Sequence, residues 1–194
     1  MARDQAIHRA AIALGSSVDS AQGTRAQHLA GALVALSRPP VARVIARSSV
    51  IRTAAVGPAG ADPAWVARQP AYLNAAAIVQ TSLSPRGLLE FLLGIERSRG
   101  RDRVREGRWG ARTLDLDLIL YDSLTIDEPG LTVPHPRLAE RAFVLVPLAE
   151  IAGAWEVPGT GGRTVAELLG AVRLIVPTGG GAPGAAPPIT EGRA

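Results

Sequence analysis

The 194-residue sequence contains neither cysteine nor lysine. The absence of cysteine excludes disulfide bonds and thiolate metal sites, and it suits a reducing compartment, so we expect a cytoplasmic protein. The absence of lysine excludes a P-loop of the Walker type, because that motif needs a lysine beside the phosphates. All 21 basic residues are arginines, which most simply reflects a coding bias. A bound phosphate must therefore contact arginine, backbone amides or a metal ion.

Long apolar runs are also missing. No run reaches the roughly 18 apolar residues that a membrane-spanning helix needs, and we expect no membrane partner. The first 17 residues have only a short apolar part and predict a strand instead of a signal peptide. Hydrophobic residues make up 47% of the chain, which is enough for one domain with a core. We expect this domain at residues 1–176 and a disordered tail, rich in glycine, proline and alanine, at residues 177–194.

The positive charge is concentrated in residues 97–112. Seven arginines and two acidic residues give this segment a net charge of +5, which exceeds the +4 of the whole chain. Such a concentration indicates a polyanionic partner, either a nucleic acid or the phosphate chain of a nucleotide.

Hydrophobic periodicity predicts the order strand, helix, strand, strand, helix, strand. The strands are predicted at residues 10–16, 41–53, 72–83 and 114–121, and the helices lie within residues 19–36 and from Ser84 onward. Residues 54–70 predict a long loop. The remaining sequence predicts a turn at His135, one helical turn, a strand near Phe143 and a helix over residues 165–172.

This order of elements is that of the split βαβ unit. We therefore expect an α+β, ferredoxin-like sandwich in which helices pack on an antiparallel sheet and further elements follow at the C-terminal end. In such a fold the helices cover one face of the sheet, and the other face is open for a site.

Two aspartates interrupt the apolar strand at residues 114–121. Because residues two apart on a strand point the same way, Asp115, Asp117 and Ile119 share one face, and the leucines at 114, 116, 118 and 120 share the core face. Two neighbouring carboxylates need a cation between them. That cation can be Mg²⁺, as in metal-assisted phosphoryl chemistry, or an arginine side chain. The pattern alone fits either chemistry or a pair of structural ion pairs on a solvated face.

The wider pattern consists of "RWGARTLDLDLI" at residues 108–119 and "LTVPHPRLAERAFVLVPL" at residues 131–148. With "ALGSS", "SSVIRT", "QPAYLNAA" and "GIERSRGR" upstream, it resembles the 6-hydroxymethyl-7,8-dihydropterin pyrophosphokinase family of the folate pathway. The resemblance covers residues 10–173 in family order. It implies transfer of the β,γ-pyrophosphoryl group of ATP to the hydroxymethyl oxygen of the pterin, with AMP as the second product.

The resemblance also implies roles for single residues. Two Mg²⁺ ions would bind Asp115 and Asp117. The catalytic residues would be these aspartates with Arg101, Arg103 and Arg112, of which Arg101 and Arg103 would lie on a mobile loop. The nucleotide would contact Glu96, Arg103, Arg112, Leu118, Thr132, His135 and Arg141. The pterin would contact Thr53, Ala54, Val56, Tyr72, Asn74, Trp109 and Phe143, with its ring between Tyr72 and Phe143.

Two other functions fit parts of the sequence. A ferredoxin-like sheet can bind RNA by stacking bases on aromatic side chains. Aromatic residues make up only 4% of this chain, and the aspartate pair would repel a nucleic-acid backbone, so we expect no nucleic acid. A nucleotidyltransferase would bind the same metals but release pyrophosphate. We expect a monomer with two small-molecule substrates, ATP and the pterin.

Overall fold

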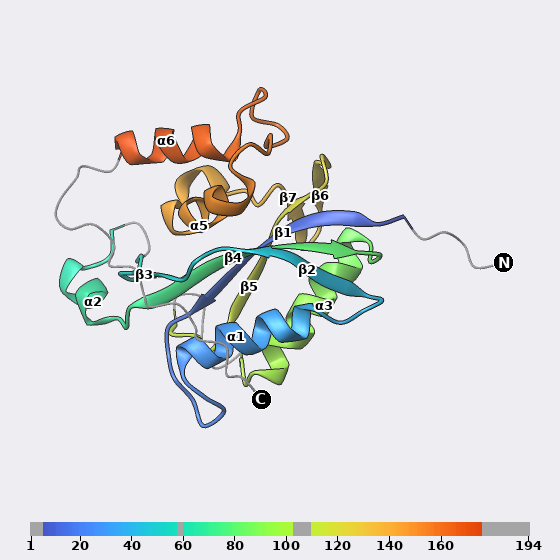
Figure 1. Ribbon diagram of the computed structural model, residues 1–194. Coiled ribbons are helices and arrows are strands. Elements are labelled where there is room, and N and C mark those ends of the chain that lie inside the picture. The colour runs from blue at the N-terminus through green and yellow to red at the C-terminus, as the bar shows by residue number, and fades with distance from the viewer. Residues whose placement is uncertain (1–5, 58–59, 103–109, 176–194) are drawn as a thin grey trace.

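The computed structural model describes residues 6–57, 60–102 and 110–175. Its centre is an antiparallel sheet in the order β2, β4, β1, β5, with β3 paired to the other end of β4 (Figure 1). The strands are β1 (His8–Ser16), β2 (Ala42–Arg47), β3 (Ile51–Thr53), β4 (Tyr72–Thr81) and β5 (Asp115–Tyr121). Because β4 lies between β1 and β2, the arrangement is the predicted split βαβ unit. The expected tail at residues 177–194 lies outside the described residues.

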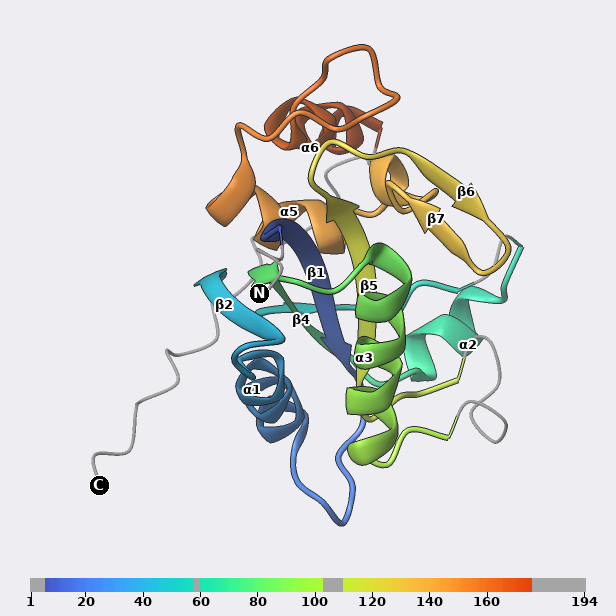
Figure 2. The ribbon, with the colours of Figure 1, turned by 90° about the vertical axis from the view of Figure 1, so that its right-hand side faces the viewer.

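Helices lie on both faces of this sheet. The helices α1 (Arg25–Leu36) and α3 (Pro85–Ser98) cover one face, and α5 (Ala142–Ala152) and α6 (Val165–Ile175) lie on the other (Figures 1 and 2). The prediction of an open second face is therefore wrong for the part of that face that α5 and α6 cover. The cause is residues 142–152, which form a helix instead of the strand predicted near Phe143.

Shorter elements complete the chain. The predicted loop at residues 54–70 contains α2 (Pro63–Arg68), and the hairpin of β6 (Ile126–Glu128) and β7 (Leu131–Val133) follows β5. A single 3-10 turn, η1 (Leu138–Glu140), precedes α5. None of the described helices is both long and apolar enough to cross a membrane.

Local sequence signals explain where the two helices of the first face begin. The hydroxyl of Thr24 accepts a hydrogen bond from the backbone of Gln27, and the Gln27 side chain bonds back to the Thr24 backbone, which makes a capping box for α1. At α3 the Ser84 hydroxyl accepts a hydrogen bond from the Gly87 backbone, and Pro85 occupies the first turn. The predicted start of this helix is confirmed.

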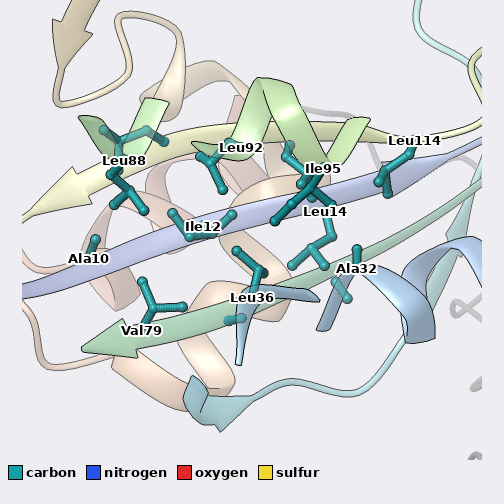
Figure 3. Packing of buried hydrophobic residues seen from close by; sticks show 14 of the residues in the cluster. Ala10, Ile12, Leu14, Ala32, Leu36, Val79, Leu88, Leu92, Ile95 and Leu114 are labelled. Carbon is teal, nitrogen blue, oxygen red and sulfur yellow. The ribbon is translucent and has the colours of Figure 1, made fainter. Parts of the chain in front are cut away.

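Two clusters of buried side chains hold the layers together. The first lies between the sheet and the helices α1 and α3 and includes Ile12, Leu14, Leu36 and Leu92 (Figure 3). The second lies between the sheet and the helices α5 and α6 and includes Ile78, Leu145, Leu148 and Leu168. The strand ends that carry Gly15, Asn74 and Asp115 lie outside the second cluster, so this part of the face is left for a site.

A bulge divides β5 between the two clusters. Leu118 pairs with Ile12 of β1 and Leu120 pairs with the preceding residue, Ala11, so Ile119 is an extra residue in the ladder. The prediction that Leu120 shares a face with the three earlier leucines is therefore wrong, because Leu120 packs in the second cluster. Asp115 and Asp117 precede the bulge, and their predicted common face is confirmed.

The predicted strand at residues 41–53 is also broken, between β2 and β3. The Ser48 backbone N–H donates to the Ala76 carbonyl at 2.9 Å, and the Ser48 hydroxyl accepts from the Ala76 N–H at 2.8 Å. Ser49 donates from its N–H and its hydroxyl to the Glu150 carboxylate at 2.8 and 2.7 Å. These bonds turn the chain so that β3 pairs with the first residues of β4.

Candidate functional site

A cavity of about 490 Å³ opens on the second face of the sheet, beside β1, β4 and β5. This volume suits a small organic substrate. The wall brings together predicted residues from five separate parts of the chain: Thr53, Ala54, Val56, Tyr72, Asn74, Arg101, Arg112, Asp115, Asp117, Arg141 and Phe143. Candidate groups for metal, phosphate and pterin therefore face one space.

The register of the three strands orders the floor of the cavity. Gly15 of β1 pairs with Asn74 on β4 and with Asp115 on β5. Ala13 pairs in the same way with Ala76 and Asp117. Adjacent strands lie about 4.8 Å apart, so Asn74 and Asp115 are separated by two strand spacings, roughly 10 Å. A substrate that reaches both residues must pass over Gly15.

Asp115 is held by two arginines. Arg101 Nη1 donates to Asp115 Oδ1, and Arg112 Nη1 donates to Asp115 Oδ2 at 2.5 Å. Burial alone would raise the pKa of the Asp115 carboxyl, but the two guanidinium groups together outweigh it and hold this pKa below its ordinary value. Asp115 is therefore ionised at neutral pH.

The charged form of Asp117 is stabilised less than that of Asp115. Arg141 Nη1 donates to Asp117 Oδ2 at 3.1 Å. Burial and then the charge of Asp115 raise the pKa of the Asp117 carboxyl, and the positive groups around it do not fully offset them. A further cation beside Asp117 would stabilise its charged form.

Glu96 lies behind Arg101 and does not line the cavity. Its side chain is 1% exposed, and its Oε1 accepts hydrogen bonds from the Leu116 N–H at 2.8 Å and from Arg101 Nη1 at 2.9 Å. Arg101 Nη1 also donates to the Leu114 carbonyl at 2.9 Å. Glu96 thus fixes Arg101 against β5, and its predicted contact with the nucleotide remains a prediction.

The opposite side of the cavity combines aromatic faces with one amide. Asn74 is 5% exposed, and its Nδ2 donates to Thr53 Oγ1 at 2.8 Å. Tyr72 begins β4 opposite Thr53, and Phe143 stands in the first turn of α5. The guanidinium carbon of Arg141 lies 5.7 Å from the centre of the Phe143 ring. This side offers flat apolar surfaces and a fixed amide to a planar heterocycle.

His135 lies beside the aspartates without being part of the wall. Its backbone N–H donates to the Ile119 carbonyl at 3.0 Å, and its Nδ1 accepts from the Arg137 N–H at 3.1 Å. Burial lowers the pKa of His135, although the charge of Asp117 opposes the shift. The neutral ring therefore carries its proton on Nε2 and can donate a hydrogen bond there.

The other predicted residues lie elsewhere. Thr132 is exposed on β7, opposite Asp127. The Leu118 side chain is in the first core cluster, so its predicted contact with a nucleotide would have to come from the backbone. Arg103 and Trp109 lie outside the described residues.

The wall also contains residues that the sequence did not predict. They are Ala13, Leu14, Gly15, Ala75, Arg137 and Val144. Strand periodicity puts Ala13 and Gly15 on one face of β1, but only the pairing of β1 with β5 shows that this is the face of the aspartates. Arg137 lies outside the arginine-rich segment at residues 97–112, and no motif in the sequence indicated it as a site residue.

The donor set of the cavity suits magnesium. Within the described ranges, no group of three or more His, Asp or Glu side chains is placed to enclose a metal ion. Asp115 and Asp117 instead present two carboxylates to an open cavity. Mg²⁺ is commonly bound by one or two carboxylates together with water and substrate phosphates, so these residues fit it.

The sequence is also similar to those of known proteins. The sequence model of the family 7,8-dihydro-6-hydroxymethylpterin-pyrophosphokinase (HPPK) matches residues 11–153. A 2-amino-4-hydroxy-6-hydroxymethyldihydropteridine pyrophosphokinase of Methylorubrum extorquens is 44% identical over 161 residues, which cover 83% of this chain and 91% of the relative. The enzyme of the same name from Pseudomonas aeruginosa is 39% identical over 165 residues, which cover 85% and 92%.

Solved structures share the fold. The wild-type HPPK-DHPS of Plasmodium falciparum with STZ-DHP superposes with a TM-score of 0.65 at 11% identity. The match covers 88% of this chain and 44% of that longer chain, so this chain spans less than half of the Plasmodium protein. At this identity the likeness concerns the fold alone.

Proposed function

Because the chain belongs to the 7,8-dihydro-6-hydroxymethylpterin-pyrophosphokinase family, we propose that it transfers the β,γ-pyrophosphoryl group of ATP to 6-hydroxymethyl-7,8-dihydropterin in this cavity. The hydroxymethyl oxygen attacks the β-phosphorus, the bond from that phosphorus to the α-phosphate oxygen breaks, and AMP leaves. The hydroxyl proton is released. The formation of the pterin diphosphate is a step of folate biosynthesis. The observation that carries the proposal is one wall that combines the aspartate pair with Tyr72, Asn74 and Phe143.

The pterin binds on the β4 side. The rings of Tyr72 and Phe143 offer their faces to the planar bicycle, and Asn74 offers its amide oxygen to the N–H groups at the edge of the ring. The bond from Asn74 Nδ2 to Thr53 fixes the orientation of this amide. The hydroxymethyl group is then directed along the floor toward Asp115.

The triphosphate binds on the β5 side. Asp115 and Asp117 would hold magnesium, for which we propose two ions, and this metal would supply positive charge to the phosphate oxygens. Arg101, Arg112 and Arg141 line the same wall. Each guanidinium has five N–H donors, so an arginine that contacts an aspartate can also donate to a phosphate oxygen.

Positioning and charge stabilisation supply most of the catalysis. Among the described wall residues the carboxylates are Asp115 and Asp117, and both are assigned to the metal. Phosphoryl transfer of this kind depends on alignment of the attacking oxygen and on cations around the transferred group more than on a strong base. Fixing Arg101 through Glu96 serves this alignment.

The relatives do not support the alternative of a nucleic-acid-binding module. The test is the identity of the nucleotide product. The chain is incubated with ATP, Mg²⁺ and the reduced hydroxymethylpterin, and the products are separated by chromatography. AMP should form in step with pterin diphosphate, and none should form without the pterin. ADP or free pyrophosphate as the product would contradict the proposal.

We further propose that the chain acts as a monomer. Light scattering during gel filtration tests this oligomeric state.

A further inference from the structure

Arg137 lines the cavity from the segment between β7 and η1. Its Nε donates to Glu140 Oε2 at 3.0 Å, and the two side chains are 46% and 64% exposed. An ion pair this exposed is weak, because water and salt screen it. The guanidinium can therefore leave Glu140 at little cost when a stronger anion enters the cavity.

The pairing of Arg137 differs from that of the other wall arginines. Arg101 and Arg112 donate to Asp115, and Arg141 donates to Asp117, and these three side chains are 6%, 21% and 21% exposed. Arg137 donates instead to Glu140, which is not part of the wall. Among the described wall residues, four arginines face two aspartates, which leaves a net charge of +2. This excess favours an anionic ligand.

The local contacts place Arg137 on the side of the cavity where Asp117 lies. Its backbone N–H donates to Nδ1 of His135, and the charges of Arg137, Arg141 and Asp117 all act on the His135 ring. Asp117 is bound by Arg141, four residues after Arg137. Arg137 is therefore on the side of the cavity that holds Asp117, where we propose that the phosphates bind.

We propose that Arg137 is a further binding residue for the polyphosphate chain of ATP, to which it donates after releasing Glu140. This inference rests on the proposed function, because it uses the same cavity and the same nucleotide. A phosphate oxygen is a better partner than Glu140, since a charge-assisted bond to a multiply charged phosphate is stronger than an exposed carboxylate pair. The role is binding, so the chemical step itself stays unchanged.

The experiment measures dissociation constants of Mg²⁺-ATP and of AMP by isothermal titration calorimetry with the full chain. Arg137→Gln should weaken Mg²⁺-ATP binding by about five- to tenfold and AMP binding by less than about twofold, because the lost bond is to the β- or γ-phosphate. Arg137→Lys should bind Mg²⁺-ATP more weakly than the wild type and more tightly than Arg137→Gln, since lysine keeps the charge but not the planar fork. Glu140→Gln should tighten Mg²⁺-ATP binding by about twofold, because it removes the competing carboxylate.

The chain offers a matched control. Arg86 pairs with Glu128 at 2.8 Å, and these side chains are 45% and 55% exposed, but neither lines the cavity. Arg86→Gln should leave both dissociation constants unchanged. If Arg137→Gln behaves like Arg86→Gln, or if it weakens AMP as much as Mg²⁺-ATP, the inference is overturned.

A failure of the proposed reaction can be distinguished from a failure of the inference about Arg137. A wild-type chain that binds Mg²⁺-ATP but produces no AMP with the pterin contradicts the proposed reaction, while the binding comparison still decides the role of Arg137. Melting temperatures of all variants should lie near that of the wild type, because the Arg137 and Glu140 side chains are 46% and 64% exposed.

Discussion

Asp115 and Asp117 lie two residues apart on β5 and face the same cavity, yet their pKa values are shifted in opposite directions. Burial disfavours the charge of both. At Asp115 the guanidinium groups of Arg101 and Arg112 outweigh that effect, whereas at Asp117 the charge of Asp115 adds to it. The first aspartate therefore stabilises the fold in its charged form, and the second is kept at a cost to stability, as is common in functional sites.

The first prediction follows from this contrast. Asp115→Asn and Asp117→Asn should each lower the rate of AMP formation by at least about 100-fold, because each removes a proposed ligand of the metal. In Mg²⁺-free buffer at pH 7, Asp115→Asn should lower the free energy of unfolding by about 2–3 kcal/mol, since it removes the carboxylate between two partly buried arginines. Asp117→Asn should leave this free energy equal or higher. Urea unfolding measures the free energy of unfolding of both variants.

The pH dependence provides the check on that prediction. The pKa of Asp115 is lowered in the folded state, so its stabilising effect is present above the unfolded pKa and is lost as the pH falls through the folded pKa. The pKa of Asp117 is raised, so its cost is present above the folded pKa and disappears as the pH falls below the unfolded value. Equal losses of stability in both variants at pH 7 would contradict the assignment.

The second prediction concerns the buried carboxylate behind Arg101. Glu96→Ala should lower the free energy of unfolding by about 3 kcal/mol, because it leaves the Leu116 N–H and the 6%-exposed Arg101 side chain without this acceptor. Glu96→Gln should cost less, since the amide oxygen can still accept one bond. Chemical denaturation measures both. Glu90 is exposed on the same helix, and Glu90→Ala should change stability by less than about 0.5 kcal/mol. A similar small effect of Glu96→Ala would contradict the buried network.

The sequence predicted the parts of the fold that depend on local pattern. The capped start of α3 and the common face of Asp115 and Asp117 follow from residue spacing alone, and the structure confirms both. The bulge at Ile119 depends instead on how β5 pairs with β1, which no local pattern contains. Residues 142–152 are rich in valine and leucine and fit a strand equally well, but packing of Val144, Leu145 and Leu148 in the second cluster favours the helix.

The candidate site was predictable in its residue types more than in its arrangement. The family resemblance supplied most of the residues that share the wall, among them Thr53 and Phe143. It did not show that Glu96 lies behind Arg101, because that depends on the packing of α3 against β5. Gly15 and Arg137 carry no distinctive motif, and they became candidates only when the register of β1 and the position of η1 were known.

The third prediction tests the orientation of the pterin amide. Thr53→Val removes the acceptor of the bond from Asn74 Nδ2, while it keeps the size of the side chain. The amide of Asn74 is then free to rotate, so KM for the pterin should rise by about three- to tenfold, as expected for one lost hydrogen bond, and KM for ATP should not change. Thr53→Ser keeps the hydroxyl and should behave like the wild type. An equal rise of both KM values would show a general distortion of the cavity instead.

The last prediction uses the position of Gly15 between Asn74 and Asp115. A methyl group at Gly15 would meet Asn74 Oδ1 at 3.4 Å and Asp115 Cβ at 3.8 Å, which are ordinary contacts, and the backbone there does not need a glycine. Gly15→Ala should therefore fold with unchanged or slightly higher stability, because alanine restricts the unfolded chain. The methyl group enters the space that a substrate must cross between Asn74 and Asp115.

KM for the pterin should consequently rise by about tenfold or more in Gly15→Ala, because overfilling a close contact costs of the order of 1–3 kcal/mol. Binding of Mg²⁺-ATP should stay within about twofold of the wild type. Gly170→Ala is the matched control, since Gly170 lies in α6 with no atom near the added methyl group, and its kinetics should not change. If Gly15→Ala is well folded and retains the wild-type KM for the pterin, the substrate does not lie across the floor, and the contact between Asn74 and the pterin must be reassigned.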